Sequence, residues 1–431
     1  MPNASRRIEV TEGQNFRHPS IHGDDLRRTI EGLEDVLRPR IRFLSENRAG
    51  LRLQNVIGNI QLNNGTILQI QPKVAGGEDW TSAVISLLTG EERIAVAGER
   101  RSGTSSVHRN LLDALADVYL TRLERAMRLD GPLLLMEREN LVLPHLRGTL
   151  NASEWLKKAA WMPHRFPVSV TRLASDNPFT KGLSEVAKIL AAASSSARIK
   201  AGLNAVRRDL SANTSPSNFS TQAATSRKLP AQWNAYKPAW SIAVAVLNRS
   251  SLFGTTGNHV GLSLAIEPWP LLEKALEKTL FAIESRGAMS GRSIETQMKG
   301  RLPLLDAERS THQGFSVEPD GRMFEDANVV ATFEAKYKPF DGIPARNDIY
   351  QAVTTASVCG AALAILVYPT SFASRIWNVN SFNGKPAKLA AIGMDMFSWA
   401  GNETANERAN YLLNFIDGIR SGNAVHVGTV A

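Results

Sequence analysis

The C-terminal part of the chain has the clearest pattern of apolar and polar positions. An unbroken apolar run over residues 361–369 predicts a strand that is buried on both faces. A shorter β-type run, residues 329–333, comes before it and ends in a charged segment. Three further elements are predicted around these runs: a helix over residues 347–356, a strand over 388–394 and a helix over 403–419. The pattern is that of an α/β domain, and we assign residues 261–431 to it.

The rest of the chain separates into two further segments. Residues 1–130 are predicted to form a β-rich module up to about residue 74 and helices after it. An apolar face over residues 111–127 predicts a core helix that ends before Asp130-Gly131-Pro132. Residues 131–260 form a mixed α/β linking region, in which the Ser-, Thr- and Asn-rich stretch 209–226 is expected to be a flexible loop.

Charged residues flank the short run in a pattern that suits metal-dependent phosphodiester hydrolysis. Pro319-Asp320 precedes Gly321-Arg322, which we interpret as a turn, and Glu334-Ala335-Lys336 ends the run 329–333. Side chains two residues apart on a strand share a face, so Glu334 and Lys336 are expected on the same side. Two carboxylates on neighbouring strands can converge on one hard cation.

The chemistry follows from the charge of the substrate. Hydrolysis requires that the phosphate charge be neutralised and that a water be activated in line with the leaving oxygen. We expect Asp320 and Glu334 to bind Mg²⁺, with the carbonyl of Ala335 as a third oxygen ligand. Lys336 would orient or deprotonate the water, or stabilise the phosphate charge. Short patterns of this kind also arise by chance in a chain of 431 residues, so the predicted elements around them have to show whether they form a site.

The order of elements resembles the core of the PD-(D/E)xK nucleases, with the acids at strand ends. Asn347 or Asp348 is expected to cap the helix that follows, and Gln351 lies one turn into it, where its amide could reach the site. This nuclease class implies a further acid upstream. Glu273 and Glu277, four residues apart on a helix predicted over residues 267–283, are the acids available, but the pattern by itself favours a solvated charged face for both; only a family resemblance at residues 269–273, described below, implies Glu273 as the upstream acid.

Composition narrows the partners and the compartment. The net charge of +9 suits a polyanion, and the single cysteine excludes an internal disulfide and a cysteine-based zinc site. The first residues contain no apolar core of a signal peptide, and no apolar run is long enough to span a membrane. These features predict an intracellular, cytoplasmic protein without a membrane partner.

Several segments together resemble the McrC family, the nuclease subunit of modified-cytosine restriction systems. They run discontinuously from about residue 50 to 420 and are, in chain order, Gly58-Asn59-Ile60, residues 67–74 ending in Pro72-Lys73-Val74, residues 146–150, residues 163–168, Trp269-Pro270-Leu271-Leu272-Glu273 and Tyr350-Gln351. The sequence departs from the family in two places. Glu334 stands where the family usually has Asp, and Leu272 replaces an aromatic residue beside Glu273.

The resemblance implies a division of labour with a second protein. A McrB-like AAA+ NTPase would recognise modified DNA and translocate using GTP. The McrC-like subunit would insert its N-terminal part, here the module of residues 1–130, into the NTPase ring, stimulate hydrolysis and supply the Mg²⁺-dependent endonuclease. The chain itself has no Gly-x-x-x-x-Gly-Lys-Ser/Thr phosphate-binding loop. A nuclease that acts alone and a non-catalytic adaptor that only activates the NTPase are the alternatives.

Overall fold

The computed structural model describes the chain in twelve segments: residues 7–19, 21–37, 42–62, 66–74, 80–89, 111–211, 227–253, 264–287, 291–296, 302–304, 316–380 and 387–421. These segments form two compact units. One unit combines residues 1–114 with residues 263–431, and the other contains residues 115–262. Most of the expected loop 209–226 lies outside the described residues.

A small β-rich module opens the first unit. Its four-stranded sheet has the order β1 (Arg7–Thr11), β6 (Ile67–Gln71), β5 (Ile57–Gln61) and β10 (Leu264–Ile266). A three-stranded sheet of β2 (Asn15–Phe16), β4 (Gly50–Leu53) and β3 (Leu44–Asn47) adjoins α1 (Gly23–Leu37). Alternate strand residues and one face of α1, such as Leu68, Ile70 and Ile30, pack into a shared core. β10 pairs with β5, so this module takes a strand from beyond residue 260.

A six-stranded sheet carries the C-terminal part of the same unit. Its order is β11 (Arg292–Thr296), β14 (Gly321–Glu325), β15 (Asn328–Ala335), β16 (Leu363–Tyr368), β18 (Lys388–Gly393) and β17 (Arg375–Asn378). The three strands β15, β16 and β18 are parallel, and every residue of β16 is buried, as the apolar run predicts. A separate short ladder joins β12 (Leu302–Pro303) to β13 (Ser316–Val317).

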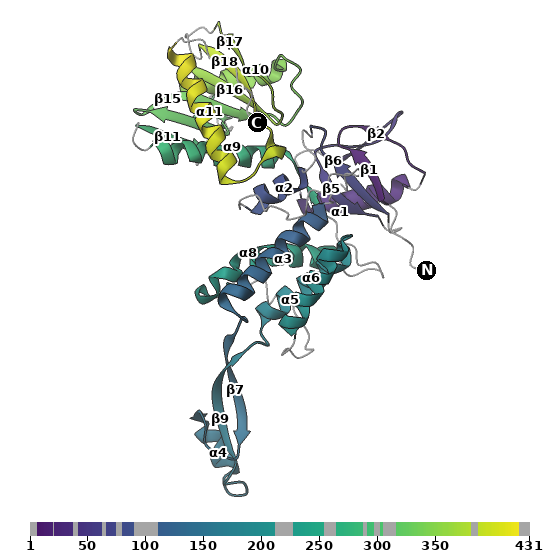
Figure 1. Cartoon of the computed structure of the whole chain (residues 1–431), viewed down its shortest axis with the longest axis vertical. Helices are drawn as coiled ribbons and strands as arrows, with labels where there is room; N and C mark the ends of the chain where they lie inside the picture. The colour runs from purple at the N-terminus through teal and green to yellow at the C-terminus, as the bar shows by residue number, and fades with distance from the viewer. Residues whose placement is uncertain are drawn as a thin grey trace, which may run out of the picture. The chain divides into compact units, whose positions relative to one another are not determined.

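Helices cover both faces of the six-stranded sheet (Figure 1). α10 (Arg346–Cys359) contacts β15, β16 and β18, and its Ala352 and Ala356 pack against Leu366. α9 (Trp269–Gly287) and α11 (Asn402–Ser421) contact each other, and α9 also contacts β11 and β15. α2 (Trp80–Thr89) contacts α9 and the short η2 helix (Met396–Ser398). The helices predicted near residues 267–283, 347–356 and 403–419 are confirmed.

The second unit consists of a helical part and a long β-hairpin. Helices α3 (Leu111–Asp130), α5 (Pro178–Ala193), α6 (Ala197–Ser211) and α8 (Lys237–Phe253) supply its core, together with the short η1 helix (Ala231–Tyr236). Leu111, Tyr119 and Leu123 of α3 are buried, which confirms its predicted apolar face. The hairpin joins β7 (Leu135–Leu143) to β9 (Phe166–Ala174), with β8 (Thr149–Leu150) and α4 (Ala152–Lys158) at its far end. Within this unit the hairpin extends away from the helices (Figure 1).

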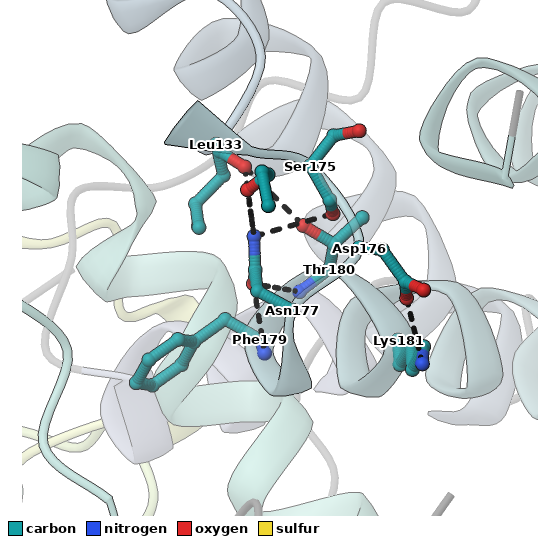
Figure 2. Close-up of polar contacts among 8 residues, drawn as sticks. Leu133, Ser175, Asp176, Asn177, Phe179, Thr180 and Lys181 are labelled. Atoms are coloured by element: carbon teal, nitrogen blue, oxygen red, sulfur yellow. Dashed lines mark hydrogen bonds and ion pairs between the residues drawn. The ribbon is translucent and has the colours of Figure 1, made fainter. Parts of the chain in front are cut away.

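Asn177 ties the root of the hairpin to α5 (Figure 2). Its Oδ1 accepts hydrogen bonds from the backbone N–H groups of Phe179 (3.1 Å) and Thr180 (3.0 Å) and so caps the helix. Its Nδ2 donates to the carbonyl of Leu133, just before β7, at 3.0 Å, and to that of Ala174, the last residue of β9, at 3.3 Å. One side chain, 1% exposed, thus joins both strands of the hairpin to the helical part.

Candidate active site

The hairpin of β14 and β15 positions the predicted acids. Its two-residue turn is Asp326-Ala327, with φ values of 48° and 66°, and not Gly321-Arg322 as the sequence suggested. Both turn residues have the positive φ that a tight hairpin turn of this type demands. Gly321 is instead the first residue of β14, paired with Phe333. Asp320, the residue before Gly321, therefore lies beside the end of β15.

Gly321 is a glycine because α9 passes directly over it. A Cβ at this position would collide with the side chain of Leu280, which packs against the strand from α9. This close approach brings α9 against the sheet next to Asp320. The glycine therefore marks a contact between helix and strand, which the sequence alone did not distinguish from a turn.

Asp320 is fixed to the end of β15 by two hydrogen bonds. Its N–H donates to the carbonyl of Phe333 at 3.1 Å, and its Oδ2 accepts from the N–H of Ala335 at 2.7 Å. The N–H and C=O of one strand residue point to the same side of the strand. The carbonyl of Ala335 consequently points to the side on which Asp320 lies.

Glu334, Lys336 and Gln351 form a network on the α10 side of the sheet. Lys336 Nζ donates to Gln351 Oε1 at 2.8 Å and lies 3.4 Å from Glu334 Oε2. Gln351 Nε2 donates to the same Glu334 Oε2 at 3.1 Å. The structure therefore brings Asp320, Glu334, Lys336 and Gln351 together at one end of β15, as the sequence predicts.

The environment of Glu334 disfavours its charge. The residue is 2% exposed, and burial raises the pKa of its carboxyl to about 7. Lys336 opposes this increase in the pKa, whereas the carboxylate of Asp320 adds to it. Oε2 receives both side-chain donors of the network, whereas Oε1 is buried away from them, and a hydrogen bond from the Thr355 side chain also acts to lower the pKa of this carboxyl. A buried carboxylate oxygen of this kind is expected to have a cationic or donor partner.

The donors present fit one hard divalent cation more closely than a zinc site. They are the carboxylates of Asp320 and Glu334 and the carbonyl of Ala335, all oxygen atoms. Among the described residues, no group of three or more His, Cys, Asp and Glu side chains is placed to hold a metal. A cation here would thus keep several waters, which is typical of Mg²⁺.

Glu273, the candidate upstream acid, lies near the start of α9. It is half-buried, as is Glu277 one turn later, so neither matches the fully solvated face that was the alternative. Glu277 Oε1 lies 3.5 Å from the hydroxyl of Thr296, the residue that pairs with Gly321. Both glutamates have contacts, so Glu273 remains a prediction as the upstream acid.

The start of α10 differs from the prediction. Ala345, not Asn347 or Asp348, is the capping residue, and no side chain caps the helix. Asp348 lies inside the first turn, where its Oδ2 forms an ion pair with Lys338 at 2.5 Å and accepts a hydrogen bond from Tyr368 at 3.5 Å. This buried link fixes the helix that supplies Gln351. Sequence reasoning missed it because Lys338 falls in a loop without periodicity.

Comparison with known proteins places the chain in a family. Residues 51–369 match the family described as "McrBC 5-methylcytosine restriction system component", which is more than half of the sequence. The chain belongs to this family. The matched range includes the segments in which a likeness to McrC was recognised and all five candidate site residues.

Two solved structures of McrBC assemblies share the fold. One is a half-complex from a tetradecameric assembly of Thermococcus gammatolerans McrB AAA+ hexamers with bound McrC, at a TM-score of 0.70 and 14% identity. The similarity covers 95% of this chain and 99% of the matched chain. The other is the T. gammatolerans McrBC complex, at a TM-score of 0.50 and 16% identity, covering 64% of this chain and 88% of the other. No curated protein matches the sequence. No helix among the described residues is long and apolar enough to cross a membrane.

Proposed function

We propose that this McrBC-family chain is the Mg²⁺-dependent DNA endonuclease subunit of a type IV restriction system. In this proposal it has a PD-(D/E)xK nuclease domain and cleaves modified DNA together with a McrB-like AAA+ GTPase, which it stimulates. The observation that carries the nuclease assignment is that Asp320, Glu334, Lys336 and Gln351 lie together at the end of β15, where Lys336 and Gln351 both contact Oε2 of the buried Glu334.

Each side chain has a role that follows from its contacts. Gln351 accepts from Lys336 and donates to Glu334, so it fixes the direction of both. With Oε2 of Glu334 satisfied, Oε1 is the oxygen left to bind a cation together with Asp320 and the carbonyl of Ala335. Mg²⁺ bound there would neutralise phosphate charge and increase the acidity of a coordinated water. The Lys336 ammonium would orient that water or stabilise negative charge on the phosphate.

Alanine variants test the nuclease assignment. Asp320→Ala, Glu334→Ala and Lys336→Ala should each abolish Mg²⁺-dependent cleavage while the chain stays folded, because these groups serve the cation and not the core. Asp341→Ala, at a loop carboxylate next to the same strand–helix connection, is the matched control and should cut at the wild-type rate. Wild-type cleavage by all three site variants would place the active site elsewhere.

The hairpin of the second unit supports a docking role. Seven of the twelve large apolar side chains that are exposed in the described part of the chain lie on it: Met136, Val142, Leu146, Leu156, Trp161, Met162 and Leu173. No residue of β7 is buried, and the buried residues of its partner strand β9 are confined to the two ends of that strand. Exposed apolar groups concentrated on one projecting element are typical of a protein interaction surface.

We therefore assign contact with the NTPase to residues 135–174, outside the segment 1–130 that sequence reasoning had favoured. The McrC of the similar half-complex is bound to McrB AAA+ hexamers, which supports a partner of this class. Six Lys and Arg residues against three Glu residues give the hairpin segment a positive charge suited to an acidic surface.

Two surface variants distinguish a docking role of the hairpin from a general effect of losing an exposed aromatic side chain. Trp161, 77% exposed at the far end of the hairpin, should be required for stimulation, so Trp161→Ser should lower NTP hydrolysis by the partner. Phe281→Ser removes an exposed aromatic side chain of α9, outside the hairpin, and should leave stimulation unchanged. Phosphate release from the isolated pair of proteins measures both. Equal stimulation by wild type and Trp161→Ser would remove the hairpin from the interface.

A further inference from the structure

Glu12 is a buried carboxylate between the β-rich module and the six-stranded sheet of the first unit. It follows β1, its side chain is 0% exposed, and it lies far from any solvent that could stabilise its charge. Charged groups in such places require several partners. Glu12 has them: its Oε1 accepts from the N–H of Asn55 at 2.9 Å and lies 3.3 Å from Lys73 Nζ, and the N–H of Lys73 donates to Oε2 at 3.4 Å.

The module is shaped around this carboxylate. Asn55 has a φ of 54°, in the left-handed region that residues other than glycine rarely adopt, and in this conformation its N–H reaches Glu12. Lys73 belongs to the Pro72-Lys73 pair that ends the β-region after β6. Asn adopts this conformation more readily than most residues other than glycine, so the turn suits its place here. With Asn55 N–H and Lys73 Nζ both at Oε1, Oε2 of Glu12 is the oxygen placed to meet a further donor.

That donor comes from the catalytic strand. Tyr337 Oη donates to Glu12 Oε2 at 2.9 Å, and Lys73 Nζ lies 4.8 Å from the centre of the Tyr337 ring. A cation at this distance over an aromatic ring is attracted to it. Tyr337 directly follows Lys336, so its two contacts hold the chain one residue beyond the nuclease lysine.

The backbone connects this anchor directly to Lys336. β15 ends at Ala335, the N–H of Lys336 donates to the Val367 carbonyl at 2.8 Å, and the N–H of Lys338 donates to the Lys336 carbonyl at 2.8 Å, which closes a tight turn at Tyr337. Fixing the Tyr337 side chain therefore restricts the backbone turn that directly follows Lys336. Lys336 Nζ has to stay within reach of Gln351 and Glu334, and a displacement of about 1 Å at such a group can cost about 100-fold in rate.

We infer that Glu12, Lys73 and Tyr337 form a clamp by which the β-rich module positions Lys336. Glu12 and Tyr337 are thus positioning residues that touch neither substrate nor cation. This inference rests on the proposed nuclease function for its consequence, while the clamp itself is a property of the fold that can be measured without cleavage.

Two readouts on the full-length chain test the clamp. Tyr337→Phe removes only the hydroxyl and should lower kcat for DNA cleavage, in the presence of the NTPase, about ten-fold with little change in KM. The amides of residues 334–338 should exchange with deuterium about five-fold faster, because the loss of one hydrogen bond lowers the free energy of local opening by about 1 kcal/mol. The exchange rates of residues 363–368 should not change. Glu12→Gln keeps an acceptor for Tyr337 and should retain more activity than Glu12→Ala.

Tyr119→Phe is the matched control, because it removes another buried tyrosine hydroxyl, one that donates to the Leu183 carbonyl at 2.7 Å in the second unit. It should leave kcat and the exchange of residues 334–338 unchanged. If Tyr337→Phe matches wild type in exchange and in kcat, the clamp is refuted. If wild type cuts no better than Lys336→Ala, the nuclease proposal fails instead. The clamp is then tested by hydrogen exchange alone: unchanged exchange of residues 334–338 in Tyr337→Phe would refute it.

Discussion

Asn177 offers a sharp test of how the hairpin is held, because one side chain makes every contact concerned. Asn177→Ala removes the acceptor for two N–H groups at the start of α5, and loss of such a cap costs about 0.5–2 kcal/mol. It also withdraws the donor from the buried carbonyls of Leu133 and Ala174, at about 1–3 kcal/mol for an unsatisfied group. The hydroxyl of Thr180 still reaches the Leu133 carbonyl at 3.4 Å and limits this loss. The second unit should therefore lose roughly 2–4 kcal/mol of unfolding free energy.

Urea unfolding, with hydrogen exchange to separate the two units, measures this loss. Exchange in β7 and the first turn of α5 should accelerate at least about 30-fold, while β16 in the first unit should keep the wild-type rate. Asn177→Asp keeps the cap acceptor but faces the same carbonyls with a negative charge. It should therefore release the hairpin root and leave the start of α5 protected. An unfolding free energy for Asn177→Ala within about 0.5 kcal/mol of wild type would refute the reasoning.

Four further predictions concern the nuclease part. Because burial raises the pKa of Glu334 from 4.5 to about 7, the metal-free folded chain holds a proton that the unfolded chain has released, and stability falls as the pH rises through that window. Glu334→Gln should therefore be more stable than wild type at about pH 8, by up to about 3 kcal/mol, and equally stable at about pH 4, as measured by urea unfolding. Gly321→Ala should cost roughly 1–3 kcal/mol in thermal unfolding, because its Cβ meets Leu280; an unchanged Tm would contradict the packing. Glu273→Ala should slow cleavage more than Glu277→Ala, and equal cleavage rates would mean that Glu273 has no role at the metal site. DNA affinity of the purified chain should be weak and should fall steeply with salt in a titration, since phosphate contacts dominate it; salt-independent binding would exclude that mode.

The sequence predicted those parts of the fold that depend on local periodicity. β16 is a run of six buried residues and α10 has an unbroken helical pattern, so both were evident, as was the shared side of Glu334 and Lys336. Gly321 was misread because a glycine needed for a close helix contact looks the same in sequence as one needed for a turn. The hairpin of β7 and β9 was not predicted because many of its apolar residues are exposed, whereas an apolar pattern identifies elements by their buried face. Tyr337 and Glu12 are 325 positions apart, a contact that no local pattern contains.

Simultaneous recording of NTP hydrolysis and DNA cleavage tests the central claim most directly. The reaction contains this chain, its AAA+ partner, Mg²⁺ and modified DNA, and compares wild type with Lys336→Ala. We expect Lys336→Ala to stimulate NTP hydrolysis as well as wild type does and to cut no DNA, because the proposed function assigns the lysine to cleavage and the hairpin to docking. Cleavage by Lys336→Ala at the wild-type rate would contradict the account, and rapid cutting by the wild-type chain without its partner would favour a nuclease that acts alone.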